Sequence, residues 1–388
     1  MGTVTLFLIA GEPSGDRLGA GLIAGLRHLV PNVRFAGVGG PLMQAEGFDS
    51  LFPMEEVSVM GLAEVLPRLR GLLRRVEQVA QAVAATDPEA LITIDSPDFC
   101  LRVARRARVL RPGLRTIHYV APSVWAWRSG RARRMARVVD HVLALLPFEP
   151  PFMTDAGMGC TFVGHPVVAD PVATPEQAQA FRARHGMAPD APVLLALPGS
   201  RRGEVRRLAP IFGEVLRRLQ PDHPGLRVVV PTLPGIAAQV RAEVATWPGQ
   251  PFVIEAAAEK PATFAAAQAA LAASGTVSLD LASAGVPMVI AYRFNPATAA
   301  ILRRMIRVET VTLVNLVSQT RAVPEFLAGE CRAERIAPAV SDLLRNGPGA
   351  QAAAMARTMD LLGRDGEDPG LRAARAVLAQ ITPRPETR

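Results

Sequence analysis

The segment that decides the fold covers residues 193–204, which read Val-Leu-Leu-Ala-Leu-Pro-Gly-Ser-Arg-Arg-Gly-Glu. An apolar run, a tight turn and a polar helix start are typical of a buried parallel strand followed by a helix. Ligands of such sheets bind at the carboxyl ends of the strands, where Gly199, Ser200 and Arg201 stand. Turn amides, the helix dipole and guanidinium groups suit a diphosphate. The alternative is a surface turn with solvated arginines.

The length and composition of the chain indicate a two-domain protein. At 388 residues the chain is longer than one hydrophobic core usually organises. Its composition is 49% hydrophobic, yet it has no run of about 18 uncharged apolar residues that would span a bilayer. The cysteines at 100, 160 and 331 are widely spaced and odd in number, and no secretion signal opens the sequence. We therefore expect a cytoplasmic protein.

Positive charge is in excess and is carried almost entirely by arginine. The formal net charge is +8, and Lys260 is the single lysine among 43 basic residues. This excess favours an anionic partner, which is a nucleic acid, a phospholipid surface or a phosphorylated substrate. A biased genome would produce the same use of arginine, so charge alone leaves the partner open.

Strands and helices alternate from the amino terminus, which predicts a doubly wound α/β domain. The apolar run 4–10 ends in the turn Gly-Glu-Pro-Ser-Gly-Asp, and a helical pattern follows to residue 29. Each later apolar run is also followed by glycine, proline or polar residues, so one edge of the sheet should carry a site. Further strands are expected at 35–38, 90–94, 116–120 and 141–145.

A second alternation begins at Val193, after a stretch rich in proline, alanine and polar residues. Its later strands are expected at 227–231, 252–254, 270–273 and 287–291, and helices close the chain. The predicted organisation is a first Rossmann-like domain at 1–168, a linker at 169–191, a second Rossmann-like domain at 192–345, and C-terminal helices at 346–388 that cross back toward the first domain.

Several long motifs match one known family. They are Ala-Gly-Glu-Pro-Ser-Gly-Asp at 10–16, Ile-Asp-Ser-Pro-Asp-Phe at 94–99, Tyr-Val-Ala-Pro-Ser-Val-Trp-Ala-Trp-Arg at 119–128, Leu-Pro-Phe-Glu at 146–149, Gly-His-Pro at 164–166, Leu-Pro-Gly-Ser-Arg at 197–201 and Ala-Ser-Gly-Thr at 273–276. With these motifs, the chain closely resembles the lipid-A-disaccharide synthase family from about residue 4 to about residue 340.

The resemblance implies an inverting glycosyltransferase with two Rossmann-like domains that face a central cleft, the GT-B fold. Such enzymes join UDP-2,3-diacylglucosamine to 2,3-diacylglucosamine 1-phosphate (lipid X) by a β-1,6 linkage and release UDP. The implied partners are these two lipids and the cytoplasmic surface of the inner membrane, which the enzyme contacts peripherally. We expect a monomer or a homodimer that exchanges its C-terminal helices.

Inversion at an anomeric carbon needs a base that takes the proton of the incoming hydroxyl. Asp95 directly follows a buried strand and aligns with the base proposed for the family, so we predict that it is the catalytic base. Asp98 is predicted to support or orient it. The alternative is that one aspartate caps the next helix while the other is solvated, and Asp98 suits that alternative better.

The donor is expected at two turns of small residues. Amides and hydroxyls at 274–276 would bind the diphosphate opposite Arg201, and Asp280 would accept from the ribose hydroxyls, where the family usually has glutamate. The alternative for 274–276 is an ordinary helix N-cap. By resemblance three further residues belong to this site. The predicted donor-binding residues are Gly199, Ser200, Arg201, Ser274, Gly275, Thr276, Asp280, Tyr292, Arg293 and Asn315.

The first turn of the chain is expected to bind the acceptor. Glu12, Ser14 and Asp16 suit a hydroxylated, phosphorylated molecule, and by resemblance they belong to the acceptor side. Ser14 has the alternative of being a turn residue only, since Pro-Ser-Gly is a strong turn signal.

An apolar pattern at helical spacing between residues 62 and 76 is interleaved with arginine. Such a helix suits the interface of an anionic membrane. The alternative is a crossover helix that covers the sheet. The residues expected at the membrane and acyl-chain surface are Leu62, Val65, Leu66, Leu69, Leu72 and Leu73.

Other chemistries find less support. The sequence has no HxxxH or CxxC spacing, and Asp95-Ser-Pro-Asp98 is not the D-x-D of metal-dependent transferases, so we expect no metal and no other cofactor. Trp125 and Trp127 precede several arginines, but this segment is short, and we expect no nucleic acid as a partner. The alternative enzyme is a UDP-sugar epimerase of the same fold.

Overall fold

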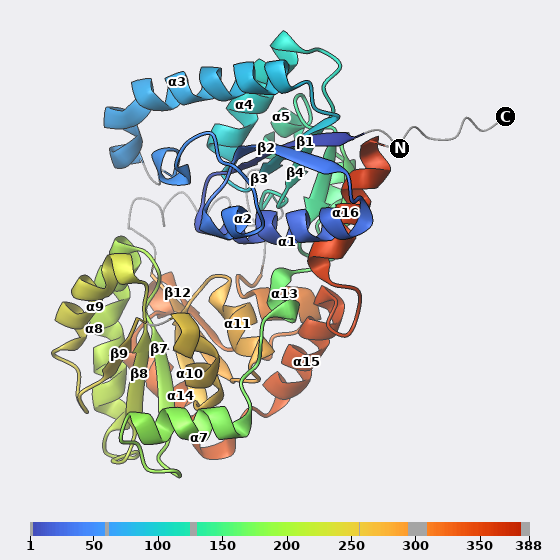
Figure 1. Cartoon of the computed structure of the whole chain (residues 1–388). Coiled ribbons are helices and arrows are strands. Elements are labelled where there is room, and N and C mark those ends of the chain that lie inside the picture. Colours follow the sequence, from blue (N-terminus) through green and yellow to red (C-terminus); the bar gives the residue numbers. More distant parts are fainter. Residues whose placement is uncertain (1–2, 59–61, 125–129, 256, 294–308, 382–388) are drawn as a thin grey trace. The chain divides into compact units, whose positions relative to one another are not determined.

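The computed structural model of the chain consists of two compact units, each built around its own sheet (Figure 1). The first unit contains Met1–Pro166 together with Asp365–Arg388, and the second contains Val167–Arg364. The described residues are 3–58, 62–124, 130–255, 257–293 and 309–381, and of residues 62–69 and 257 the backbone alone is described.

Proline begins several helices of the first unit. Pro13, Pro41 and Pro97 each stand at the first position of a helix, where a backbone N–H has no intrahelical partner to lose. The strands and helices of this unit are β1 (Val4–Ala10), α1 (Pro13–Leu29), β2 (Val33–Val38), α2 (Pro41–Ala45), α3 (Leu62–Thr86), β3 (Ala90–Ile94), α4 (Pro97–Leu110), β4 (Thr116–Tyr119), α5 (Gly130–Met135), β5 (His141–Ala144), α6 (Pro150–Thr154), β6 (Gly159–Phe162) and α16 (Pro369–Ile381).

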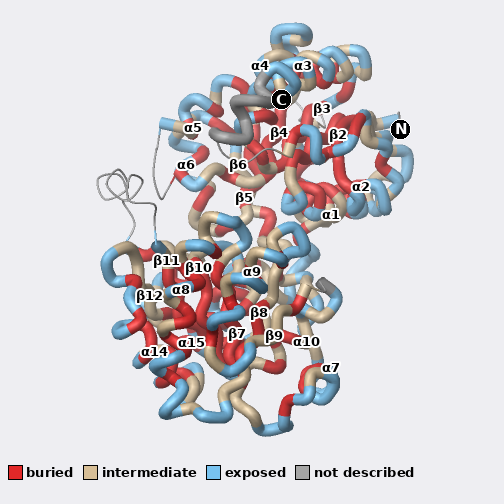
Figure 2. Tube along the Cα trace, turned by 90° about the vertical axis from the view of Figure 1, so that its left-hand side faces the viewer, coloured by how far each residue is buried: buried red, intermediate tan, exposed pale blue. Residues whose placement is uncertain are grey.

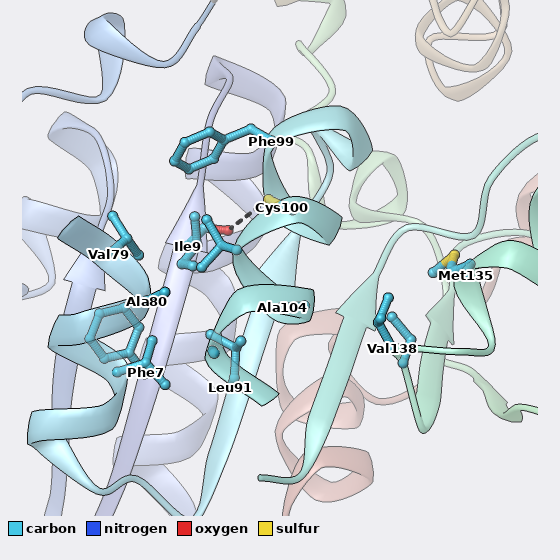
Figure 3. Packing of buried hydrophobic residues seen from close by; sticks show 14 of the residues in the cluster. Phe7, Ile9, Val79, Ala80, Leu91, Phe99, Cys100, Ala104, Met135 and Val138 are labelled. Atoms are coloured by element: carbon cyan, nitrogen blue, oxygen red, sulfur yellow. Dashed lines mark hydrogen bonds between the residues drawn. The ribbon is translucent and has the colours of Figure 1, made fainter. Parts of the chain in front are cut away.

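The first sheet is parallel, in the order β2-β1-β3-β4-β5-β6, and it is covered on both faces. Successive side chains of β1 point to opposite faces. Phe7 and Ile9 pack under α3 and α4, where Cys100 Sγ lies 4.0 Å from the carbonyl oxygen of Ile9 (Figure 3). Leu6 and Leu8 pack under α1 and α16 on the other face. Double coverage explains why the central strands are continuous apolar runs.

The second unit repeats this architecture. Its sheet is parallel, in the order β12-β11-β10-β7-β8-β9. Its strands and helices are α7 (Pro175–Arg184), β7 (Val193–Leu197), α8 (Arg202–Leu219), β8 (Arg227–Pro231), α9 (Ala237–Val244), β9 (Phe252–Ile254), α10 (Lys260–Ala265), β10 (Ala269–Ala273), α11 (Val277–Ser283), β11 (Met288–Tyr292), α13 (Leu313–Ser318), β12 (Glu325–Leu327), α14 (Ala333–Asn346) and α15 (Ala350–Leu362).

The core of the second unit lies between its sheet and the helices around it. Buried residues follow the strands, and exposed residues follow the outer faces of the helices (Figure 2). On one face Phe212 of α8 and Trp247 pack together, and the indole Nε1 of Trp247 donates to the carbonyl oxygen of Ala209 at 3.0 Å. The polar atom of this buried ring is therefore satisfied.

The segment expected as a linker contains α7, which packs with the second unit. Phe181 and Arg182 are buried, and the Arg182 guanidinium donates to the carbonyl oxygens of Ala191 and Ala266 at 2.7 and 2.5 Å. A buried arginine that satisfies several carbonyl groups ties the segment to the domain that follows it. The second unit thus begins at Val167 and extends to Arg364.

The carboxyl-terminal helices are divided between the units. Helix α15 packs against α11 and α13 of the second unit, whereas α16 packs along α1 of the first. Glycines bring α1 and α16 close, since a Cβ atom on Gly25 would lie 2.6 Å from the carbonyl oxygen of Gly370. The return to the first unit therefore begins after residue 364.

Two parallel six-stranded sheets confirm the predicted α/β class with two Rossmann-like domains. The strands at 4–10, 90–94, 227–231 and 252–254 have the predicted bounds. Strands β6 and β12 were not predicted, because both are short and partly exposed and so lack an apolar run. Within the described part of the chain, no helix combines the length and the apolar character needed to cross a bilayer.

Candidate functional site

Two turns of the first unit meet at the carboxyl edge of its sheet. Strands β1 and β3 are adjacent and parallel, with Ala10 opposite Ile94, so the turns that follow these residues lie side by side. A Cβ atom on Gly11 would lie 2.8 Å from Ser96 Oγ. One on Gly15 would lie 3.0 Å from the carbonyl oxygen of Ile94. The glycines of the first turn are therefore required by the close approach of the second.

Asp95 is held at this edge by an unusual backbone and by two hydrogen bonds. The φ angles of Asp95 and Ser96 are +54° and +41°, a region that costs a non-glycine residue about 1–3 kcal/mol. Ser14 Oγ donates to Asp95 Oδ2 at 2.8 Å, and the Ser96 N–H donates to Asp95 Oδ1 at 2.9 Å. Both oxygens of the half-buried carboxylate are thus oriented. Strain of this kind is typical of functional positions.

A row of polar residues, which we call the polar row, connects Asp95 to the first turn. The hydroxyl of Ser96 donates to Glu12 Oε1 at 3.0 Å, so Ser14, Asp95, Ser96 and Glu12 connect the two turns. Asp98 is exposed on the first turn of α4, where a carboxylate interacts favourably with the helix dipole. The contacts that orient Asp95 come from the two serines.

Asp16, which the sequence assigned to the acceptor side, has a structural role in the first unit, and its contact with an acceptor stays a prediction. It is 2% exposed, and its Oδ1 accepts from the N–H groups of Gly40 and Met43 at 2.9 and 3.0 Å. Its Oδ2 accepts from the Leu42 N–H at 2.9 Å. These are N–H groups at the start of α2, which an α-helix leaves without intrahelical partners. The buried carboxylate therefore holds α2 in place.

Adjacent strands also bring the predicted donor residues of the second unit together. Strands β11, β10 and β7 are neighbours and parallel, so their carboxyl ends share one edge. Ser200 and Arg201 follow β7, Gly275 and Thr276 follow β10, and all four are exposed. Arg201 is the N-cap of α8, so the positive end of this 18-residue helix lies at the turn. The edge offers amides, hydroxyls and a guanidinium to an anion.

A carboxylate that the sequence reading missed lies at this edge. Glu204 on the first turn of α8 is 12% exposed at its side chain, accepts from the Tyr292 hydroxyl at 3.3 Å and lies 3.9 Å from the Arg201 guanidinium. Burial, and then the charge of Glu204, raise the pKa of Tyr292. The sequence signal that could have indicated this residue is its position in the first turn of a helix, three residues after Arg201.

Asp280, the predicted ribose residue, forms an ion pair with the single lysine of the sequence. Lys260 Nζ lies 3.0 Å from Asp280 Oδ2, and the two side chains are 45% and 23% exposed. The ammonium group also lies 5.5 Å from the ring centroid of Phe264. Asp280 lies on α11, which follows β10, and Lys260 is the first residue of α10, which precedes β10.

The remaining donor candidates differ in their exposure. Asn315 is 1% exposed, its amide nitrogen donates to the Val323 carbonyl oxygen at 2.9 Å, and its amide oxygen accepts from the Val323 N–H at 3.0 Å. This pairing fixes the chain after α13 and gives Asn315 a structural role. Arg293 is exposed at its side chain, and its carbonyl oxygen accepts from Arg207 Nε at 3.1 Å.

The predicted membrane helix is α3, and it is also a crossover helix. Val76 and Val79 are buried in the core under the sheet, as the crossover alternative requires. One turn earlier Leu72 is half-buried and Leu73 is 47% exposed. Of the other predicted membrane residues, namely Leu62, Val65, Leu66 and Leu69, the backbone alone is described. Trp125 and Trp127 lie outside the described residues.

Comparison with known proteins decides the family. The family described as lipid-A-disaccharide synthetase matches residues 6–380. The chain belongs to this family. The lipid-A-disaccharide synthase of Ruegeria pomeroyi is 59% identical over 384 residues, which cover 97% of this chain and 95% of that protein. The Rhodospirillum centenum enzyme is 51% identical over 388 residues, covering 99% and 96%. The predicted family is therefore confirmed.

Solved structures share the fold of this synthase at low sequence identity. A putative UDP-N-acetylglucosamine 2-epimerase from Listeria monocytogenes has a TM-score of 0.63 and 13% identity, and covers 100% of this chain and 99% of its own. The calicheamicin glycosyltransferase CalG4 has a TM-score of 0.59 and 18% identity, with 98% and 99% covered. These similarities confirm the predicted GT-B class.

Membership of the family makes this protein a glycosyltransferase that forms the lipid A disaccharide, as the sequence predicted. Its named synthase relatives reach 59% identity, whereas the epimerase above shares 13%. The epimerase alternative has no better support.

Proposed function

We propose that this lipid-A-disaccharide synthase uses Asp95 as general base and binds the donor diphosphate at the carboxyl edge of the second sheet. The donor is UDP-2,3-diacylglucosamine, and the acceptor is 2,3-diacylglucosamine 1-phosphate. Glu12 and Ser14, which lie in the same polar row as Asp95, face the acceptor. Each unit of the chain thus contributes one half of the chemistry.

The reaction is a displacement at C1 of the donor sugar. The oxygen of the acceptor 6-hydroxyl group forms a bond to C1 while the bond from C1 to the diphosphate oxygen breaks. The hydroxyl proton passes to the Asp95 carboxylate, and UDP departs with the bonding electron pair. Inversion of C1 gives the β-1,6 linkage. Catalysis then depends on a correctly oriented base and on stabilisation of the departing charge.

The observation that carries this proposal is the geometry of Asp95. Its carboxylate is half-buried, stands at the end of a fully buried strand, and is fixed by Ser14 and Ser96 in a strained backbone. A single well-defined orientation is what proton transfer in a transition state requires. A solvated aspartate that only caps a helix needs none of these contacts.

The edge of the second sheet supplies the electrostatic part. Arg201 and the N-terminus of α8 place positive charge beside the exposed turn after β7, and Thr276 adds a hydroxyl after β10. Charge that develops on the leaving diphosphate is stabilised best by donors already in place. Removal of Arg201 should therefore weaken binding of UDP and slow its displacement.

The test is release of UDP from UDP-2,3-diacylglucosamine, with and without 2,3-diacylglucosamine 1-phosphate, in detergent micelles. We expect release to require the acceptor and to yield a disaccharide 1-phosphate. The variant Asp95→Asn should still bind UDP and form no disaccharide. If this variant turns over at the wild-type rate, Asp95 is not the base. If a folded protein binds UDP but releases none from the donor, the proposed substrates are wrong.

We also propose that the reaction needs no metal ion and no other cofactor. Among the described residues, no group of three or more His, Cys, Asp or Glu side chains is placed to hold a metal ion. In this proposal arginine and helix dipole supply the charge that a metal supplies elsewhere. Turnover should be the same with a strong chelator and with added magnesium. Activity that disappears with chelator and returns with magnesium would contradict the proposal.

We place the enzyme at the cytoplasmic surface of the inner membrane, where its acylated substrates lie. Leu73 on α3 is 47% exposed and is flanked by the exposed residues Arg70 and Arg74. Apolar side chains with arginines beside them bind the interface of anionic lipid. Leu72→Ser with Leu73→Ser should reduce binding to anionic liposomes. The control is Leu361→Ser on α15, which is 39% exposed. If the double variant and the Leu361→Ser control bind the liposomes equally well, α3 is not the membrane-binding surface.

We propose a monomer as the working unit, with a homodimer that exchanges C-terminal helices as the alternative. Helix α16 packs on α1 of its own chain, with Gly25 against Gly370. The same contacts would form between two chains if the helix were exchanged. The molar mass from light scattering, measured over a range of concentrations, decides between the two states.

A further inference from the structure

We propose that Glu204 is a positioning residue of the donor site. Held by the Tyr292 hydroxyl, it fixes the guanidinium of Arg201 where the donor diphosphate binds. The inference rests on the donor site proposed above and deepens it. Glu204 touches neither the base nor the transferred sugar in this proposal, and it acts on the reaction through Arg201.

A carboxylate at this edge needs an explanation. A diphosphate carries negative charge, and a like charge nearby weakens its binding. Glu204 nevertheless lies on the first turn of α8, next to the turn of Gly199, Ser200 and Arg201. Its side chain is 12% exposed, so it is not a solvated surface acid. A carboxylate that is this little exposed is expected to have charged or hydrogen-bonding partners.

The contacts of Glu204 join separate elements at the edge. Its Oε1 accepts from the hydroxyl of Tyr292, the last residue of β11, at 3.3 Å. The same oxygen lies 3.9 Å from Nη1 of Arg201, which follows β7. The carboxylate therefore links the end of β11 to the turn after β7, two strands that β10 separates in the sheet.

The turn itself is shaped around this side chain. Gly199 has a φ of +120°, and a Cβ atom on it would lie 2.6 Å from Glu204 Cβ and 2.7 Å from Oε2. Glycine is thus required at position 199 both by the backbone angle and by the volume of Glu204. The Glu204 side chain thus lies against the turn and is largely covered, whereas the Arg201 side chain is mostly exposed.

Holding Arg201 has value because this side chain is long and 66% exposed. A free arginine loses much rotamer freedom when it binds a ligand, and a preorganised one loses less. The negative charge of Glu204 offsets part of that gain by repelling the diphosphate. We expect the gain to exceed the repulsion, with a net effect of about two- to fivefold on UDP affinity, the size typical of one partly exposed ionic contact.

The test is calorimetric titration of UDP and of uridine into matched variants. They are the wild type, Glu204→Gln, Arg201→Ala, Tyr292→Phe, Glu204→Gln with Arg201→Ala, and the control Glu214→Gln. Glu214 lies on the same helix and pairs with Arg217 and Arg218 at 2.9 and 3.1 Å. Thermal unfolding of every variant checks that the second unit is intact.

We expect Glu204→Gln to weaken UDP binding about two- to fivefold and to leave uridine binding and stability unchanged. In the Arg201→Ala background the same substitution should cause no further loss and should tighten UDP binding slightly, because the group that Glu204 positions is gone and only its repulsion of the diphosphate is removed. Tyr292→Phe should weaken UDP binding in the same direction, and Glu214→Gln should match the wild type. These results together would support the proposal that Tyr292 holds Glu204 and that Glu204 positions Arg201.

Two results overturn the positioning role while leaving the donor site in place. One is an unchanged or tighter UDP affinity of Glu204→Gln beside a clear loss in Arg201→Ala. The other is an equal loss on adding Glu204→Gln with and without Arg201, which would show that Glu204 acts independently of it. If the wild type does not bind UDP, or if Arg201→Ala binds it as well as the wild type, the donor site itself is wrong.

Discussion

The hydroxyl of Ser14 lies 2.8 Å from Oδ2 of Asp95, and this contact connects the turns after two adjacent strands, β1 and β3. The residues are 81 positions apart in the sequence, and the parallel pairing of the strands brings them together. The turn that the sequence assigned to the acceptor and the aspartate assigned to the base are therefore one polar unit. This relationship allows the role of each member to be separated by experiment.

Replacement of Asp95 by asparagine should lower kcat about 10²–10⁴-fold, the range that general-base catalysis contributes. UDP affinity should not change, because the donor residues lie in the other unit. Ser14→Ala should lower kcat several-fold, since the carboxylate loses one of two orienting hydrogen bonds. Steady-state kinetics and UDP titration check both effects.

The control for these variants is Asp155→Asn, an exposed carboxylate of the same unit that follows α6. It should retain wild-type kinetics. Asp98→Asn measures the support that the sequence analysis assigned to Asp98. A loss with Asp98→Asn as large as that with Asp95→Asn would move the base to Asp98.

The sequence predicted the edges at which the site residues lie, because those edges depend on local patterns. Apolar runs followed by small or polar residues placed Asp95, Arg201 and Thr276 at strand ends, and the structure brings the latter two to adjacent strands. Family motifs then supplied roles. Parallel topology alone was enough to group Arg201 with Thr276.

What the sequence did not predict depends on contacts between distant segments. Asp16 reads as a polar turn residue, but its carboxylate serves α2, about 25 positions further on. The side-chain amide of Asn315 likewise forms both of its hydrogen bonds given above with the backbone of Val323. In the sequence, Glu204 is an ordinary acidic residue at the start of a helix. Only the structure shows that the Tyr292 hydroxyl donates a hydrogen bond to it. A motif shows that a polar residue is required at a position, and tertiary pairing shows which group it serves.

Asp16→Ala should destabilise the first unit by about 3 kcal/mol, because three N–H groups at the start of α2 lose a charged acceptor. The midpoint of urea denaturation measures the loss. Asp49→Ala, which removes an exposed carboxylate nearby in the chain, should leave the midpoint unchanged. If Asp16→Ala keeps its stability and only raises the KM for the acceptor, the contact with the acceptor that the sequence predicted is correct.

The pair of Asp280 and Lys260 should determine how strongly the ribose is recognised. A carboxylate that accepts from the ribose hydroxyls makes UDP bind more tightly than 2′-deoxy-UDP. Asp280→Asn should weaken UDP about tenfold and reduce this preference, since a hydrogen bond to a charged group is lost. Lys260→Met should have a smaller effect in the same direction, because the ammonium lies 3.0 Å from the carboxylate.

Lys260→Arg is the informative control for this pair, because arginine is the basic residue at every other position. It should bind UDP nearly as well as the wild type if charge alone matters. An unchanged preference for UDP over 2′-deoxy-UDP in Asp280→Asn would remove Asp280 from the ribose site. Competitive titration with the two nucleotides measures the preference directly.

Acid should destabilise the first unit through buried histidines, His118 first among them. His118 is 1% exposed, and its Nδ1 lies 2.7 Å from the Thr93 hydroxyl. Burial lowers the pKa of His118 from 6.5 to about 4, against the opposing effect of the Asp95 charge. Above pH 6.5 the ring is neutral in the folded and the unfolded chain, so it makes no difference to stability there.

Below pH 6.5 the unfolded chain binds a proton that the folded chain does not, so stability falls as the pH drops toward about 4. The loss attributable to His118 is about 3 kcal/mol across this range.

Urea denaturation between pH 4 and pH 8 should show a shallower pH dependence for His118→Gln than for the wild type. The control His28→Gln removes an exposed histidine in the last turn of α1 and should leave the slope as it is. A slope that His118→Gln leaves unchanged would show that other groups, such as His141 or His165, whose pKa values burial also lowers to about 4, carry the acid sensitivity.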